Sequence, residues 1–142
     1  MNEQTLTARW RSWAPQLRSV MRIAAAFLFM QYGTGKLFAF PHALLPNGGT
    51  VPIASLLGVA GLFEVIGGTL MLVGLFARPV AFVLAGEMAV AYFKAHAPMG
   101  FWPLFNNGLP AVFFCFVWLY LSAAGPGPWS IDALRRHPGN AG

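Results

Sequence analysis

Charged side chains are scarce in this sequence. Only 9% of its 142 residues are Asp, Glu, Lys or Arg, whereas 57% are hydrophobic. A soluble domain usually carries about a quarter charged residues. So little charge leaves too little polar surface to keep a chain of this length in water. Composition therefore excludes an ordinary soluble domain and favours a membrane protein, and the length suggests a single domain.

Cysteine and histidine are also rare. The lone Cys115 excludes an internal disulfide and a two-cysteine redox relay, and we interpret it as a small buried apolar residue. His42, His96 and His137 are widely separated in the sequence, and no metal-ligand spacing or glycine-rich phosphate loop accompanies them. We therefore assign no metal site.

Negative charge is scarcer than positive charge, which gives the chain a net charge of +5. The basic residues avoid the apolar runs and gather near their ends. This distribution is typical of the charges that orient a membrane protein, and it is not that of a nucleic-acid surface. We expect the lipid bilayer, and no nucleic acid, as a partner.

The longest apolar run, residues 52–76, carries one charge, Glu64, at its middle. As a helix it would be roughly 37 Å long, enough to cross a hydrocarbon core of about 30 Å. A carboxylate at the midplane costs ~2.5–3.5 kcal/mol, so it should face the protein interior and find a partner. Gly61, Gly67 and Gly68 share its face and let a neighbouring helix approach. Glu64 is either a working group or a hydrogen-bonded packing residue.

Three further apolar segments, at about 20–40, 79–97 and 109–124, predict the remaining crossings. The expected fold is all-α, an integral membrane four-helix bundle over residues 20–124. Residues 1–19 form either a helix on the membrane surface, which Pro15 bends or ends, or a basic leader. Residues 125–142 form a tail.

Four crossings place both termini on one side of the membrane. The side that holds more arginine and lysine should be the cytoplasm, by the positive-inside rule. The other side would hold only Lys36 and Lys94. The terminal side would hold seven arginines, at positions 9, 11, 18, 22, 78, 135 and 136.

Polar residues predict a site in the outer half. Glu87 lies near the centre of the third crossing, so Glu64 and Glu87 form the candidate polar centre. Lys94 follows Glu87 at i+7, ~10 Å along the axis and too far for a direct bond. Lys36 either extends to the interface or turns inward toward an acid. We expect an outward pocket, the alternative being lysines that reach the headgroups and no shared cavity. The candidate rim residues are Lys36, Lys94, His96, Trp102 and Asn106.

The sequence resembles the DoxX family of small bacterial membrane proteins over about residues 20–134. The resemblance implies a four-helix protein of the bacterial inner membrane. Some relatives are similar to membrane subunits of quinone-linked oxidation of reduced sulfur compounds, and many have no assigned activity. It is carried by Arg22, GTGKLF (33–38), GLFEVIGGTLMLVGLFARPVA (61–81), EMAVAYFKAHAPMGFWPLFNNG (87–108) and CFVWLYLSAAGPGPWSID (115–132).

Three functions remain open. In the first, the protein is the membrane component of a quinone-linked redox system, with quinone as the candidate cofactor and electrons from a partner protein or a bound cofactor. In the second it is a small proton-coupled transporter. In the third it is a non-catalytic membrane organiser or partner subunit. The oligomeric state is left open.

Overall fold

The computed structural model describes residues 2–136, and within this range the chain is helical and has no strand. This confirms the all-α prediction. Residues 137–142 of the predicted tail, with His137, lie outside the described residues. The elements are α1 (Glu3–Phe38), α2 (Leu56–Val73), α3 (Ala77–Ala91), a π-helical turn η1 (Tyr92–His96), a 3₁₀ turn η2 (Ala97–Met99), α4 (Leu109–Ala124) and α5 (Ile131–Arg136).

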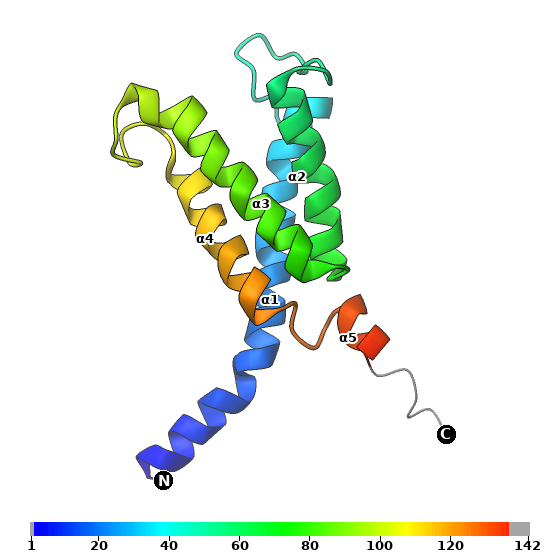
Figure 1. Ribbon diagram of the computed structural model, residues 1–142, viewed down its shortest axis with the longest axis vertical. Helices are drawn as coiled ribbons and strands as arrows, with labels where there is room; N and C mark the ends of the chain where they lie inside the picture. The colour runs from blue at the N-terminus through cyan, green and yellow to red at the C-terminus, as the bar shows by residue number, and fades with distance from the viewer. Residues whose placement is uncertain (1, 137–142) are drawn as a thin grey trace.

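Helix α1 joins the predicted surface helix and the predicted first crossing into one element of 36 residues. Asn2 caps its start by accepting a hydrogen bond from the Thr5 amide at 3.0 Å. Pro15 lies inside α1 and does not end it. A proline removes one backbone donor and bends a helix, while the turns on either side continue. The N-terminal part of α1 accordingly runs in a different direction from the rest of the helix (Figure 1).

Helix α2 is shorter than the predicted crossing at 52–76. Ser55 caps its start, because the Ser55 hydroxyl oxygen accepts a hydrogen bond from the Gly58 amide at 3.0 Å. Gly74, with φ 70°, ends it in the left-handed conformation that glycine adopts without strain. Helix α4 has the bounds that the sequence predicts.

The long helices pack as two pairs. Helix α1 lies along α2, and α3 lies along α4; the pairs meet along α2 and α3 and, more narrowly, between α1 and α4. The pairs diverge toward the end that carries segments 39–55 and 97–108, which we call the loop end (Figure 1). The start of α1, the turn at 74–76 and α5 lie at the opposite end, which we call the terminal end.

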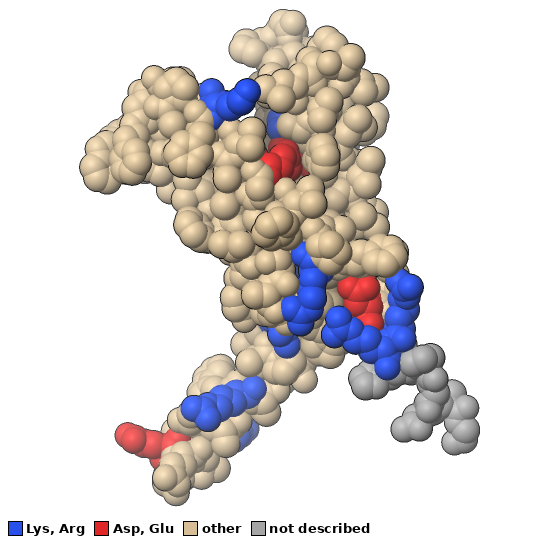
Figure 2. All heavy atoms as spheres, in the orientation of Figure 1, with Lys and Arg blue, Asp and Glu red and all other residues tan. Residues whose placement is uncertain are grey.

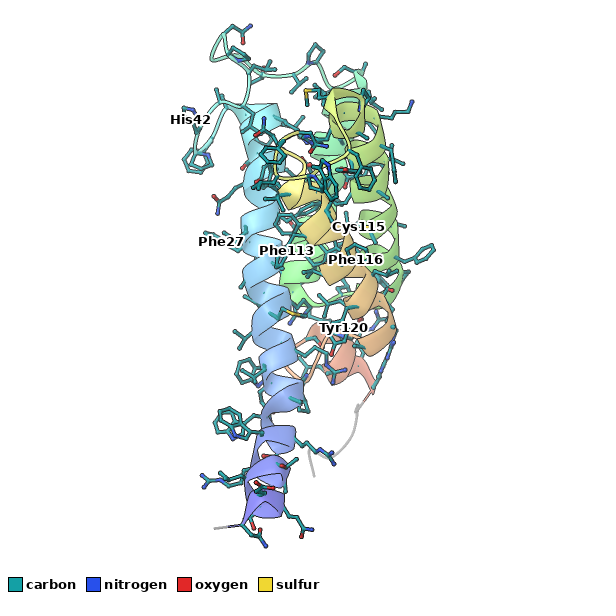
Figure 3. All side chains as sticks on the ribbon, turned by 90° about the vertical axis from the view of Figure 1, so that its left-hand side faces the viewer. Phe27, His42, Phe113, Cys115, Phe116 and Tyr120 are labelled. Atoms are coloured by element: carbon teal, nitrogen blue, oxygen red, sulfur yellow. The ribbon has the colours of Figure 1, made fainter. Side chains whose placement is uncertain are left out.

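Aromatic rings fill the contact between α1 and α4. The ring centroids of Phe29 and Phe114 are 5.1 Å apart, and those of Phe29 and Trp118 are 5.3 Å apart. Other aromatic rings point away from the protein, and Phe113, Phe116 and Tyr120 are exposed along α4 (Figure 3). In water such apolar faces would be unfavourable, but they suit contact with hydrocarbon chains.

Two helices of the described chain are long and apolar enough to cross a membrane, Leu56–Val73 and Ala77–Met99. In each of them only about a third of the residues are buried by the rest of the protein. Leu109–Ala124 is a shorter apolar helix. These helices therefore present mostly apolar side chains to their surroundings, as a lipid environment requires.

Arg22 is one of the seven arginines that the sequence places at the terminal end, but it is not a surface charge. It is fully buried, and its guanidinium donates to the carbonyl oxygens of Pro126 at 2.8 Å and Leu72 at 2.6 Å. It also donates to the carbonyls of Met71 and Trp129. These carbonyls belong to the last turn of α2 and the segment before α5. Arg22 therefore satisfies backbone acceptors that helix α2 leaves open at its end.

Helix α3 receives its N-terminal cap from a residue far along the chain. The Asp132 carboxylate accepts hydrogen bonds from the amides of Phe76 at 2.9 Å and Ala77 at 2.8 Å. Asp132 lies in α5, whose own start is capped by the Ser130 hydroxyl oxygen, which accepts a hydrogen bond from the Ala133 amide at 3.2 Å. A carboxylate at the positive end of a helix dipole is favourable. The cap attaches α5 to the start of α3.

Candidate functional site

The centre of the candidate site is an ion pair between α1 and α2. The Lys36 ammonium nitrogen lies 2.6 Å from Oε1 of Glu64. The Glu64 side chain is 3% exposed and the Lys36 side chain 17%. Of the two orientations open to Lys36, the structure has the inward one. Glu64 faces the interior and has a partner, as expected, although its second oxygen has no hydrogen-bond partner within residues 2–136.

Glycine allows this pair to form. A Cβ atom at Gly33 would lie 2.8 Å from the carbonyl oxygen of Gly61 and 2.9 Å from the Cβ of Glu64. No side chain fits at that distance, so α1 and α2 cross with their backbones almost in contact. Lys36 lies one turn after Gly33 and can reach Glu64 directly. On the other side of α2, the Leu84 side chain of α3 packs against Gly67, where a Cβ atom would lie 2.7 Å from a Leu84 methyl group.

Glu87 of α3 adds a second carboxyl group to the pair. It is close enough to both Glu64 and Lys36 for Coulomb interaction. Both of its carboxylate oxygens are buried, and neither has a hydrogen-bond partner among the described residues. We call Lys36, Glu64 and Glu87 the polar centre. It holds two carboxyl groups and one ammonium, so one carboxyl group remains to accept a hydrogen bond, a proton or a cation from elsewhere.

The polar centre reaches one face of the molecule. Acidic side chains are visible in a recess between the loop-end halves of α2 and α3, with basic side chains above them (Figure 2). Lys94, the second lysine, is exposed at this end and forms no ion pair within residues 2–136. The structure thus brings Lys36 to the acids and leaves Lys94 in the position of a rim residue.

His96 and Asn106 belong to a separate network that fastens the 97–108 segment. The Nδ1 atom of His96 lies 2.9 Å from the carbonyl oxygen of Asn106, and the ring stacks on Tyr92. The buried Asn106 amide donates to the carbonyl of Gly100 at 2.6 Å and its oxygen accepts from the Gly108 amide at 2.8 Å. The Tyr92 hydroxyl donates to the carbonyl of Phe101. These hydrogen bonds hold the loop together.

The aromatic loop lies at the surface. Trp102 is 68% exposed, and Phe101 and Phe105 are exposed beside it. Phe101 and Trp102 pack edge to face with their centroids 5.4 Å apart. Such rings suit the membrane–water interface, where their apolar bodies meet the headgroup region.

A separate groove lies between α1 and α4. It has a volume of about 750 Å³ and is mostly apolar, with Leu28, Tyr32, Phe113 and Val117 among its lining residues and His42 at its loop end (Figure 3). Phe114 also lines it and packs against Phe29, with the ring centroids 5.1 Å apart. Lys36, Glu64 and Glu87 are not among its lining residues.

Sequence reasoning missed Tyr92 and the buried role of Arg22. Tyr92 follows Glu87 by five residues and begins the π-helical turn, and a helical wheel places it as one more apolar residue. Arg22 stands between Met21 and Ile23 in an apolar run, and that position is the available signal that it is not a surface charge. No group of three or more His, Cys, Asp or Glu side chains within residues 2–136 is arranged to hold a metal ion.

Comparison with known proteins gives the family. The model of the DoxX family matches residues 17–97, which include the polar centre. An uncharacterized protein of Haemophilus influenzae is 37% identical over 123 residues, which are 84% of this chain and 91% of that protein. No solved structure matches the chain. The family match, together with the outward apolar helices, shows that the chain is a membrane protein that belongs to the DoxX family.

Proposed function

We propose that the chain is a multi-pass protein of the bacterial inner membrane, with four crossings and both termini in the cytoplasm. Its four long helices run alternately between the terminal end and the loop end, so that each accounts for one crossing. Residues 20–124 contain the crossings, residues 1–19 reach the cytoplasmic interface, and residues 125–142 form a cytoplasmic tail. The charge asymmetry supports this orientation, since seven arginines precede or follow crossings on the terminal side and two lysines lie on the other.

Within this arrangement the polar centre is the functional site, and a quinone headgroup is its ligand. The observation that carries this proposal is the buried carboxyl group of Glu87, which lies beside the Lys36–Glu64 pair and lacks a hydrogen-bond partner in the described chain. Charged groups inside a membrane are costly, and they commonly mark a path for a ligand or a proton. A carboxyl group that the fold leaves without a partner is available to a ligand.

Each residue has a defined role in quinone chemistry. The Lys36 ammonium can donate a hydrogen bond to a quinone carbonyl oxygen, and the Glu87 carboxyl group can transfer a proton to that oxygen. Glu64 holds the ammonium in place. Reduction of a quinone to a quinol consumes two electrons and two protons, of which Glu87 delivers one to the oxygen beside it and water delivers the other to the second oxygen. The side chains supply proton transfer only, so the electrons come from a partner protein or a bound cofactor.

Quinone reduction by the protein copurified with its partners from native membranes tests this proposal, with a reduced sulfur compound or a reduced dye as electron donor. Glu87→Gln keeps the size of the side chain and removes its proton, so we expect the rate to fall about a hundredfold, the usual contribution of a positioned acid or base. Gly86→Ala is the matched control, because a Cβ there meets no atom within 4 Å. A full rate in Glu87→Gln would contradict the proposal.

The same variants separate the alternatives. A proton-coupled transporter would take up its substrate into vesicles under a pH gradient, and Glu87→Gln would abolish that uptake without any effect on quinone reduction. A membrane organiser would show neither activity, and its variants would change only the stability or the partners of the protein. The direct Lys36–Glu64 contact is compatible with this third reading, because it also fixes the packing of α1 on α2.

A further inference from the structure

A basic pocket lies at the terminal end, between the start of α3 and α5. It has a volume of about 360 Å³ and is lined by three arginines, one carboxylate, an aromatic ring and a proline. Basic side chains surround the acidic one at this position beside α5 (Figure 2). The lining residues are Phe76, Arg78, Pro79, Asp132, Arg135 and Arg136.

The carboxylate of Asp132 does not neutralise the arginines. Its two oxygens accept hydrogen bonds from the amides of Phe76 and Ala77. No arginine of the pocket forms an ion pair within residues 2–136. The Cζ atom of Arg135 lies 5.1 Å from the centroid of the Phe76 ring. A guanidinium in this position can still donate hydrogen bonds from its N–H groups. Three positive charges and one negative charge therefore leave the pocket with an excess of +2.

An apolar groove continues from this pocket along the membrane face. It has a volume of about 340 Å³ and lies between α2 and α3. Pro79 lines both the pocket and the groove. From Pro79 the groove passes Val80 and then Val83 and Leu84, one turn nearer the loop end, with Ile66 and Leu70 of α2 opposite. The charged pocket at the helix ends and the apolar groove thus adjoin each other at Pro79.

We propose that this pocket and groove together bind one anionic phospholipid. Arg135 and Arg136 would hold the headgroup phosphate, since Arg78 donates to the carbonyls of Ser122 and Ala123, and one acyl chain would lie in the α2–α3 groove. A guanidinium matches the oxygens of a phosphate with two parallel hydrogen bonds, and arginines next to a membrane attract anionic lipids. A free phosphate ion would meet the same arginines but would leave the groove unused. The continuity at Pro79 therefore favours the lipid. This inference depends on the membrane location of the chain and not on quinone chemistry.

Native mass spectrometry of the full chain in detergent, titrated with phosphatidylglycerol or phosphatidylcholine, tests the inference. We expect phosphatidylglycerol to bind more tightly than phosphatidylcholine. Arg135→Gln with Arg136→Gln should weaken phosphatidylglycerol binding about thirtyfold, in line with the attraction of two arginines for an anionic lipid. Arg9→Gln with Arg11→Gln is the matched control. It removes the same charge at the terminal end, outside the pocket, and should change binding less than about twofold.

Three further variants or probes make the test decisive. Val83→Trp fills the groove and should weaken phosphatidylglycerol binding without a change in charge. Arg135→Lys with Arg136→Lys keeps the charge and should retain part of the binding, which shows that the loss in the glutamine variant is not a folding defect. Inorganic phosphate should not displace the lipid. Equal losses in the pocket variant and the control, full binding by Val83→Trp, or displacement by phosphate would each overturn the proposal.

Discussion

The ammonium of Lys36 and the carboxylate of Glu64 lie 2.6 Å apart, although the two residues are 28 positions apart in the sequence. They belong to α1 and α2, which cross closely at Gly33 and Gly61. The Glu64 side chain is nearly inaccessible to solvent, and the Lys36 side chain is 17% exposed. A contact of this kind both fixes the packing of two helices and places charge inside a membrane protein, and variants can separate the two effects.

Removal of one partner should cost more than removal of both. Lys36→Met leaves the Glu64 carboxylate buried without its ammonium, and Glu64→Leu leaves the ammonium alone; each should lower the free energy of unfolding by about 3–5 kcal/mol. The double variant removes both charges and should be closer to the wild type. Glu64→Gln, which keeps an acceptor for Lys36, should be tolerated. Thermal unfolding in detergent measures these differences.

Additive losses in the double variant would contradict the ion pair, because two independent residues would then contribute separately. Equal stability of Glu64→Gln and Glu64→Leu would show that the hydrogen bond to Lys36 does not contribute to the free energy of unfolding.

The close crossing of α1 and α2 predicts a sharp difference between two glycines. Gly33→Ala places a methyl group against the Gly61 carbonyl oxygen and should destabilise the protein by about 1–3 kcal/mol through overpacking. Gly86→Ala, which has open space around its Cβ position, should leave stability unchanged or raise it, because alanine is the better helix former. Unfolding midpoints of the two variants measure the difference, and equal midpoints would mean that the helices do not approach as described.

Arg22 should be among the least replaceable residues outside the polar centre. Arg22→Met removes the donor of the carbonyl oxygens of Pro126, Leu72 and Trp129, whereas the Met71 carbonyl keeps a hydrogen bond from the Gly74 amide. Since unsatisfied buried acceptors cost about 1–3 kcal/mol each, we expect a loss of at least ~3 kcal/mol. Arg11→Met, at an exposed position, is the control. Limited proteolysis after residue 124 would report the release of the tail. A stable, protease-resistant Arg22→Met protein would contradict this role.

The sequence predicts where the helices lie, but it does not predict where α2 and α3 begin and end. Apolar length predicts crossings, and the small residues beside Glu64 predict the face on which α1 packs. The bounds of α2 and α3 depend on caps. Ser55 is a local signal, but the Asp132 cap of α3 comes from the other end of the chain. Only the folded path of the chain brings Asp132 to that helix.

The sequence predicts which residues form the candidate site, but it does not predict which of them pair with each other. Glu64 and Glu87 stand out because charge is rare in apolar runs. The choice of Lys36 over Lys94 as the partner depends on the crossing at Gly33, since a lysine near a helix end reaches the interface equally well. Arg22 looked like an interface charge for the same reason. Its burial depends on the carbonyl groups that the tail brings to it.

Reporter fusions test the proposed orientation. Fusions at residues 47 and 104, in the two loop-end segments, should behave as periplasmic, and a fusion at residue 142 should behave as cytoplasmic. The reason is the excess of arginine at the terminal end, which the positive-inside rule keeps in the cytoplasm. A cytoplasmic reporter at residue 47 together with an external C-terminus would reverse the orientation.

The most direct test of the polar centre as a ligand site is the binding of a short-tailed quinone to the purified protein in lipid nanodiscs. The wild type should bind it saturably, and Glu87→Leu should weaken binding about tenfold or more, the value of a lost hydrogen bond to a charged group. Gly86→Ala, on the adjacent open position of α3, should bind like the wild type. Equal affinities of the wild type and Glu87→Leu, or no saturable binding by the wild type, would contradict the account.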